Sequence, residues 1–144
     1  MSDPAIASLP AGACAEASLV VQPSDTAEAL RLTSEDEFPA VFATSRMVAL
    51  MELAAARAMK PLLKEGELSV GVAVEIRHVA ATALGQRVRA VAQYAGREGK
   101  LHRFRVEAFD EGGSIGAGEH TRAIVETGRL LAGAARRAQL RSET

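Results

Sequence analysis

The sequence predicts a single α+β domain in which one long helix packs against an antiparallel β-sheet. Two patterns predict this class. Between Thr44 and Lys60, apolar residues recur at helical spacing and strong helix formers dominate the composition. From Val70 to Glu126 the period changes from 3.6 to 2, and glycine-containing turns divide the segment into strands. A length of 144 residues suits one domain with its own hydrophobic core.

The segment before the long helix has little regular structure. Residues 1–16 are rich in Ala and Ser and are expected to be flexible. A short strand is predicted at 18–22, ended by Pro23, and a helical turn is predicted at 26–32. The acidic stretch 33–39 ends at a proline and should be irregular.

The long helix presents one apolar face. Thr44 or Ser45 suits the N-cap position, and Pro61 should end the helix near Lys60. The positions that share the apolar face are Met47, Leu50, Met51, Ala54 and Ala58. This face must be buried, and the sheet that follows is available to cover it.

Four strands are predicted after the helix. In the first, Val70, Val72, Val74 and Ile76 alternate with polar or small residues, so the even-numbered side chains should face the core. The other strands lie near 88–94, 104–108 and 114–126, with turns at Gly85, 96–99 and 110–113. A strand, a long helix and a four-stranded meander give the plan of a hotdog fold. We therefore expect a hotdog domain over 17–127, followed by a basic helix or tail over 128–144.

Composition excludes several classes of function. The net charge is −1 and the charges are interspersed, unlike the basic surface of a nucleic-acid-binding protein. Cys14 is the only cysteine, which excludes a disulfide framework and a cysteine-based metal site. No secretory signal and no apolar stretch of roughly 18 residues is present, so we expect no membrane span and a cytoplasmic location. Because aromatic residues are few, the small core side chains would gain from further burial in a dimer.

Glu52 is a lone carboxylate in an apolar part of the helix. By periodicity it lies beside Val48, Ala55 and Met59 rather than on a polar stripe. Glu52 is therefore either exposed on the solvent side or placed for function, and the pattern does not decide between these interpretations.

His78 continues the even-numbered register of its strand and so falls on the apolar face. It is either a hydrogen-bonded core residue or a functional imidazole. His102 and His120 share this ambiguity, and neither has an acidic companion that the sequence identifies. The three histidines form no metal-binding motif, and motifs of serine hydrolases and P-loop proteins are absent.

Thr44 and Gly71 also admit two interpretations each. Thr44 is explained by helix capping, but the free N–H groups of a helix start can also hold a developing oxyanion. Gly71 interrupts a strand, which indicates a β-bulge or a close approach of the backbone to a ligand. A glycine that simply makes room under a helix would give the same pattern.

Several motifs together resemble the fluoroacetyl-CoA thioesterase-like family. They follow one another in matching order from about Leu19 to Glu126. The motifs are FATSRMVALME (42–52), VGV (70–72), HVAAT (78–82) with Gly85, FRVEA (104–108) and GEHTRA (118–123).

This resemblance implies a dimeric hotdog enzyme that hydrolyses short acyl-CoA thioesters. The catalytic Thr, Glu and His of the family fall on Thr44, Glu52 and His78. The residues expected to contact the substrate are Gly71, Phe38, Phe42 and Arg122. The resemblance implies no metal and no cofactor, because CoA is part of the substrate. The expected assembly is a homodimer or a dimer of dimers.

The sequence departs from the specialised member of the family just before the helix. Phe38 is the one aromatic residue in the stretch 36–39, and acidic residues precede it where an apolar lid would be expected. The expected activity is therefore hydrolysis of a broader or different range of acyl-CoA thioesters than fluoroacetyl-CoA alone.

The hypothetical mechanism meets a geometric constraint. Glu52 would attack the thioester carbonyl or deprotonate a water that does so, and His78 would supply a proton to the leaving thiolate. Thr44 would orient Glu52, yet eight residues of helix span about 12 Å, so both cannot meet within one straight helix. Either Thr44 lies on a loop that folds back, or two subunits contribute to each site. The rival functions are a hotdog module that binds an acyl thioester without turnover, and an enoyl-CoA hydratase, for which no Asp–His pair is evident.

Overall fold

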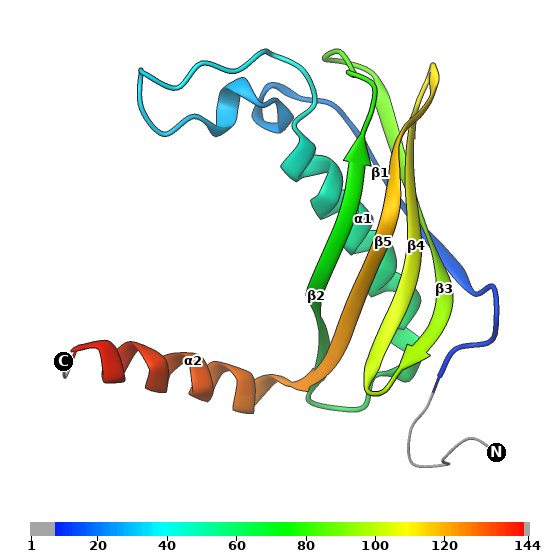
Figure 1. Cartoon of the computed structure of the whole chain (residues 1–144), viewed down its shortest axis with the longest axis vertical. Helices are drawn as coiled ribbons and strands as arrows, with labels where there is room; N and C mark the ends of the chain where they lie inside the picture. Colours follow the sequence, from blue (N-terminus) through cyan, green and yellow to red (C-terminus); the bar gives the residue numbers. More distant parts are fainter. Residues whose placement is uncertain (1–7, 143–144) are drawn as a thin grey trace.

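A long helix lies across the concave face of a curled antiparallel sheet (Figure 1). The computed structural model describes residues 8–142. Its strands and α-helices are β1 (Cys14–Val20), α1 (Thr44–Met59), β2 (Glu67–His78), β3 (Arg87–Glu98), β4 (Leu101–Asp110), β5 (Gly113–Glu126) and α2 (Thr127–Ser142). The five strands follow the order β1-β3-β4-β5-β2, so β1 and β2 form the edges of the sheet. This is the predicted hotdog fold. The predicted meander is confirmed for β3, β4 and β5 and is wrong for β2, which pairs with β5 instead of β3.

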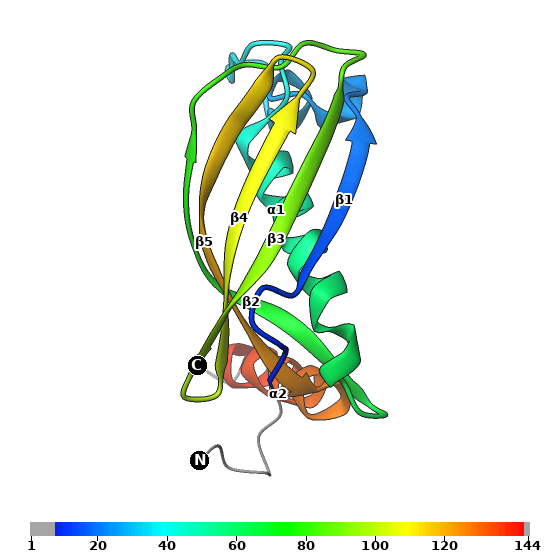
Figure 2. The ribbon, with the colours of Figure 1, turned by 90° about the vertical axis from the view of Figure 1, so that its right-hand side faces the viewer.

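The hydrophobic core lies between α1 and the sheet. The predicted apolar face of the helix is buried at every position: Met47, Leu50, Met51, Ala54 and Ala58. Figure 2 shows β5, β4, β3 and β1 side by side in front of α1. The helix packs mainly against β1 and β3. Its side toward β2 and β5 is less covered, and polar side chains occupy that side.

Two boundaries near the N-terminus differ from the sequence prediction. β1 begins at Cys14 instead of residue 18, because its pairing with β3 continues as far as Cys14 opposite Gln93. The domain boundary expected at residue 16 therefore falls inside a strand, and residues 1–7 lie outside the described part of the chain. The N-cap of α1 is Ala43 rather than Thr44 or Ser45, and no side chain caps this end of the helix. The hydroxyl of Thr44 contacts His78 instead.

The pairing of β2 with β5 shifts by one residue just after Gly71, which marks a β-bulge. Directly paired residues of antiparallel strands point to the same face of a sheet. Gly71 pairs with Arg122 and Val74 pairs with His120, and both of these β5 side chains face α1. Val70 therefore points to the outer face. The prediction that even-numbered residues face the core is wrong before the bulge and holds from Val74 onward.

β2 is an open edge of 12 residues with apolar side chains in contact with solvent. The large apolar side chains that are exposed on and next to it are Leu68, Val72, Val74 and Val79. The loop over 31–41 and helix α2 project beyond this edge at its two ends (Figure 1). A long, exposed and apolar edge strand is a surface that natural proteins usually cover.

The basic C-terminal segment is helical through Ser142. Its leucines Leu130, Leu131 and Leu140 are exposed. Among residues 8–142, no helix has both the length and the apolar character required to cross a membrane. The cytoplasmic location stays a prediction.

Candidate active site

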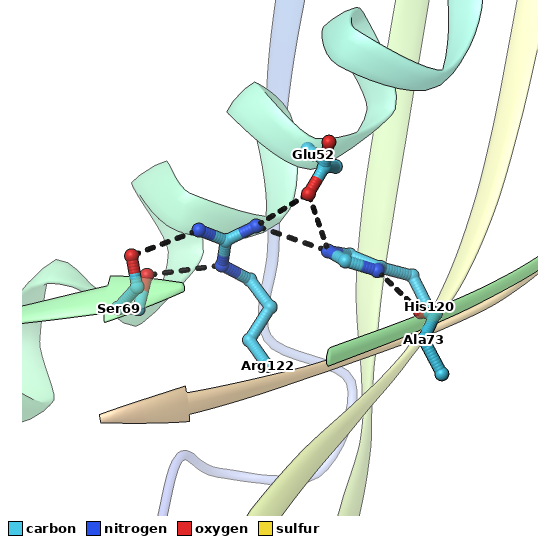
Figure 3. A network of polar contacts seen from close by, with 5 residues as sticks. All are labelled: Glu52, Ser69, Ala73, His120 and Arg122. Carbon is cyan, nitrogen blue, oxygen red and sulfur yellow. Dashed lines mark hydrogen bonds and ion pairs between the residues drawn. The ribbon is translucent and has the colours of Figure 1, made fainter. Parts of the chain in front are cut away.

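Glu52 lies on the side of α1 that faces β5 and β2, with 39% of its side chain exposed. Its Oε1 atom is 3.4 Å from Nη1 of Arg122 and 3.9 Å from Nε2 of His120 (Figure 3). Both partners are buried residues of β5. Glu52 is therefore the counter-charge of a buried guanidinium and still reaches solvent, which combines the two interpretations that the sequence left open.

The guanidinium of Arg122 is fixed by three elements. Its Nε donates to Oγ of Ser69 and its Nη2 donates to the backbone oxygen of Ser69, both at 3.0 Å. Its Nη1 lies 3.0 Å from Nε2 of His120 and points toward Glu52. Burial lowers the pKa of Arg122 from its ordinary value and Glu52 opposes this shift, but an arginine remains a cation in proteins. The cluster thus holds a positive charge beside the Glu52 carboxylate.

Gly71 makes room for the Glu52 side chain. A β-carbon at position 71 would overlap with Oε1 of Glu52 and would lie 3.3 Å from a ring carbon of His120. The glycine also begins the β-bulge of β2. Its role in this chain is therefore spatial, because only a residue without a side chain leaves the carboxylate in its present position.

Thr44 and His78 form a second polar pair. Oγ1 of Thr44 lies 2.8 Å from Nδ1 of His78, which joins the first turn of α1 to the end of β2. Thr44 is exposed, whereas Nε2 of His78 is buried and has no hydrogen-bond partner among the described residues. The pair can pass a proton between an exposed hydroxyl and an imidazole.

The structure does not bring all three expected catalytic residues together within one chain. Thr44 and Glu52 both belong to one continuous helix, and the eight residues between them span about 12 Å. The alternative in which Thr44 lies on a folded-back loop is thereby wrong. One chain contains a Thr44–His78 pair at one end of α1 and a Glu52 cluster near its middle.

The two phenylalanines expected to contact substrate lie in different environments. Phe38 is 51% exposed in the loop before α1. Phe42 is 1% exposed and belongs to the hydrophobic core, so it packs under the helix start and presents no surface to a ligand. The expectation for Phe42 does not fit its position in this chain.

Two residues of this cluster, His120 and Ser69, are not among the site residues expected from the sequence. The sequence identifies no acidic companion for His120, but the fold places it beside Glu52. The sequence did contain one indication: residues 120 and 122 are two positions apart on a strand, so their side chains point to the same face of the sheet. Ser69 could not be found in this way, because the bulge after Gly71 changes which residues of β2 face the helix.

Comparisons with known proteins agree on one family. The model of the fluoroacetyl-CoA-specific thioesterase family, FlK, matches residues 21–128. The fluoroacetyl-CoA thioesterase of Streptantibioticus cattleyicolor is 44% identical over 108 residues, which cover 74% of this chain and 78% of that protein.

Solved structures give the same result. A crystal structure of the fluoroacetyl-CoA thioesterase FlK superposes with a TM-score of 0.84 at 37% identity, covering 90% of this chain and 98% of the other. A thioesterase superfamily member from Thermus thermophilus superposes with a TM-score of 0.81 at 38% identity, covering 93% and 96%. The fold, the matched residues and these similarities together establish that the chain belongs to the fluoroacetyl-CoA-specific thioesterase family.

Proposed function

We propose that this protein hydrolyses short-chain acyl-CoA thioesters to the free acid and CoA. The observation that carries the proposal is the Glu52 carboxylate, which is held by Arg122 through Oε1 while the side chain remains partly exposed. Membership of a thioesterase family supports the reaction type. FlK structures with fluoroacetate and CoA, and with acetyl-CoA, support an acyl-CoA substrate.

In the proposed reaction, the oxygen of a water molecule forms a bond to the acyl carbon, and the carbon–sulfur bond of the thioester breaks. Glu52 either removes a proton from the attacking water or attacks the carbonyl itself, forming an anhydride that water then hydrolyses. His78 and Thr44 deliver a proton to the departing thiolate, which yields CoA with a free thiol. These steps use protein side chains and water, so the proposal includes no metal and no cofactor.

The oxyanion that forms on the thioester carbonyl needs hydrogen-bond donors. The first backbone N–H groups of α1 have no partner within the helix and lie at its positive end. We assign oxyanion stabilisation to this helix start, next to Thr44.

We further propose that the working unit is a homodimer formed through β2. Pairing the open β2 edges of two chains would satisfy their free backbone groups and cover the exposed valines Val72 and Val74. In a two-fold antiparallel pair centred near Val74, His78 of one chain lies opposite a position next to Gly71 of the partner subunit. Each site would then combine Thr44 and His78 of one chain with Glu52 of the partner subunit.

The substrate proposal is tested by incubating the protein with a panel of short acyl-CoAs and a thiol-detecting reagent. Release of thiol is expected for at least one short acyl group. Glu52→Gln keeps the side-chain size and should lower kcat by about 10²- to 10⁴-fold, because it removes the base and nucleophile. Glu119→Gln is the control, since Glu119 is exposed and pairs with Arg103 at 3.8 Å. Binding without thiol release by the unmodified protein would identify a binding module instead.

The shared-site proposal is tested by mixing Thr44→Ala and Glu52→Ala chains. Random exchange makes about half of the dimers heterodimers, and each of these regains one of two sites. The mixture should therefore recover about a quarter of the activity of the unmodified dimer. Activity no higher than that of either parent, despite subunit exchange shown by mass spectrometry, would place each site within a single chain.

A further inference from the structure

His120 is a buried polar residue for which the proposed reaction has no step. It lies on β5 with 1% of its side chain exposed, between Ala73 of β2, Arg122 of its own strand and Glu52 of α1 (Figure 3). The residue of β4 that pairs with His120 is Phe104, which is apolar and buried. The charged groups near the His120 ring are Arg122 of β5 and Glu52 of α1.

The contacts of His120 determine which ring nitrogen carries the proton. Nδ1 lies 2.8 Å from the backbone oxygen of Ala73, which can only accept, so Nδ1 must be the donor. Nε2 lies 3.0 Å from Nη1 of Arg122, which can only donate, so Nε2 must present a lone pair. The ring is therefore neutral, with its proton on Nδ1. Burial lowers the pKa of His120, and the Arg122 charge lowers it further, against the opposing effects of the Ala73 hydrogen bond and Glu52.

The same contacts explain how His120 acts on Glu52. The 3.9 Å between Nε2 of His120 and Oε1 of Glu52 is too long for a hydrogen bond. Arg122 is the group that joins them, because its Nη1 contacts both atoms. Ser69 holds the other side of the guanidinium, so His120 supplies the second anchor that directs Nη1 toward the carboxylate.

We propose that His120 is a positioning residue of the thioesterase reaction, which holds Arg122 against Glu52 through the lone pair of its Nε2. This inference rests on the proposed function, because Glu52 is the reacting carboxylate only in that function. A neutral acceptor at this point keeps the guanidinium from rotating toward other acceptors, so the carboxylate keeps one orientation.

A matched pair of substitutions separates this role from a structural one. In His120→Gln, the amide oxygen can reach the former position of Nε2 and accept from Arg122. In His120→Asn, the shorter amide can reach the former position of Nδ1 and donate to the Ala73 oxygen, but it offers no acceptor to Arg122. We expect His120→Asn to lower kcat by about tenfold or more with KM within about twofold, while His120→Gln stays within about threefold of the unmodified protein. The reverse order of the two variants would mean that His120 only ties β5 to β2.

The protonation state is tested without any activity. Long-range nitrogen–proton NMR correlations of the unmodified protein at pH 7.5 should show His120 as the neutral ring with the proton on Nδ1. A ring protonated on Nε2, or on both nitrogens, would overturn the inference even if acyl-CoA hydrolysis is found. Conversely, absence of hydrolysis together with the expected ring state would count against the proposed function and leave the hydrogen-bond assignment standing.

Discussion

The absence of a side chain at position 71 determines where the Glu52 carboxylate can rest. Oε1 of Glu52 occupies the space that a β-carbon at position 71 would need, so the carboxylate lies where a side chain of β2 would otherwise be. Arg122 and His120 close this space from β5. The position of Oε1 of Glu52 therefore depends on a helix, a bulged edge strand and the strand beside it.

Gly71→Ala should move the carboxylate without unfolding the domain. The new methyl group would displace the end of a flexible, partly exposed side chain, so the free energy of unfolding should change by no more than about 1 kcal/mol. Displacement of Glu52 by about 1 Å should lower kcat about 10- to 100-fold. Gly133→Ala in α2 is the control, since outside the helix's own backbone its new methyl group would meet only the end of the Arg136 side chain, at 3.9 Å. Kinetics and urea unfolding of both variants check this, and normal kcat in Gly71→Ala would contradict the spatial role.

At the scale of elements, the sequence predicted the helix and the positions of the strands well because these depend on local periodicity. The predicted meander was wrong for β2, which pairs with β5 instead of β3, because strand pairing depends on contacts between distant residues. The buried face of α1 matched at all five positions, as packing against a sheet selects one helical stripe. The register of β2 was not predictable, because the bulge after Gly71 arises from pairing with β5. The proximity of Glu52 and His120 was not predictable either, because these residues belong to α1 and β5, which only the tertiary structure brings together.

The open edge of β2 leads to a prediction about assembly. Val72→Lys places a charge in the exposed edge where the dimer is proposed, and it should shift the protein toward monomer and lower activity in parallel. Leu32→Lys is the control, because Leu32 is 93% exposed in the loop before α1. Sedimentation equilibrium and thiol release measured on the same samples check this. A monomeric Val72→Lys protein with full activity would refute the shared site.

At the scale of the whole molecule, two buried histidines make the stability of the fold dependent on pH. Burial lowers the pKa of His102, and the charge of Arg97 lowers it further. Burial also lowers the pKa of His120. Nδ1 of His102 lies 2.9 Å from the hydroxyl of Tyr94, and both of these residues are buried.

This arrangement determines the direction of the pH effect. Below the ordinary histidine pKa of about 6.5, the unfolded chain binds protons that the folded chain does not, so the free energy of unfolding falls as the pH falls. The contribution of the two neutral histidines to the free energy of unfolding is fully present above about pH 7.5. Below about pH 6.5, each histidine lowers the free energy of unfolding by at most about 1.4 kcal/mol per pH unit. Urea unfolding between pH 7.5 and 5.5, at one protein concentration, should show this fall and a smaller one in His120→Gln. Equal slopes in the two proteins would contradict the assignment to His120.

The interval between Thr44 and Glu52 has a consequence for how this helix can vary. Each residue of an α-helix turns the chain by about 100°, so eight residues leave the two side chains about 80° apart after two full turns. Insertion or deletion of a single residue between them would rotate Glu52 by about 100°, away from Arg122 and toward either the core or open solvent. The length of this stretch is therefore as important to the proposed site as the side chains at its ends, and we expect a change in its length to disturb Glu52 more than a single substitution at an exposed position within it.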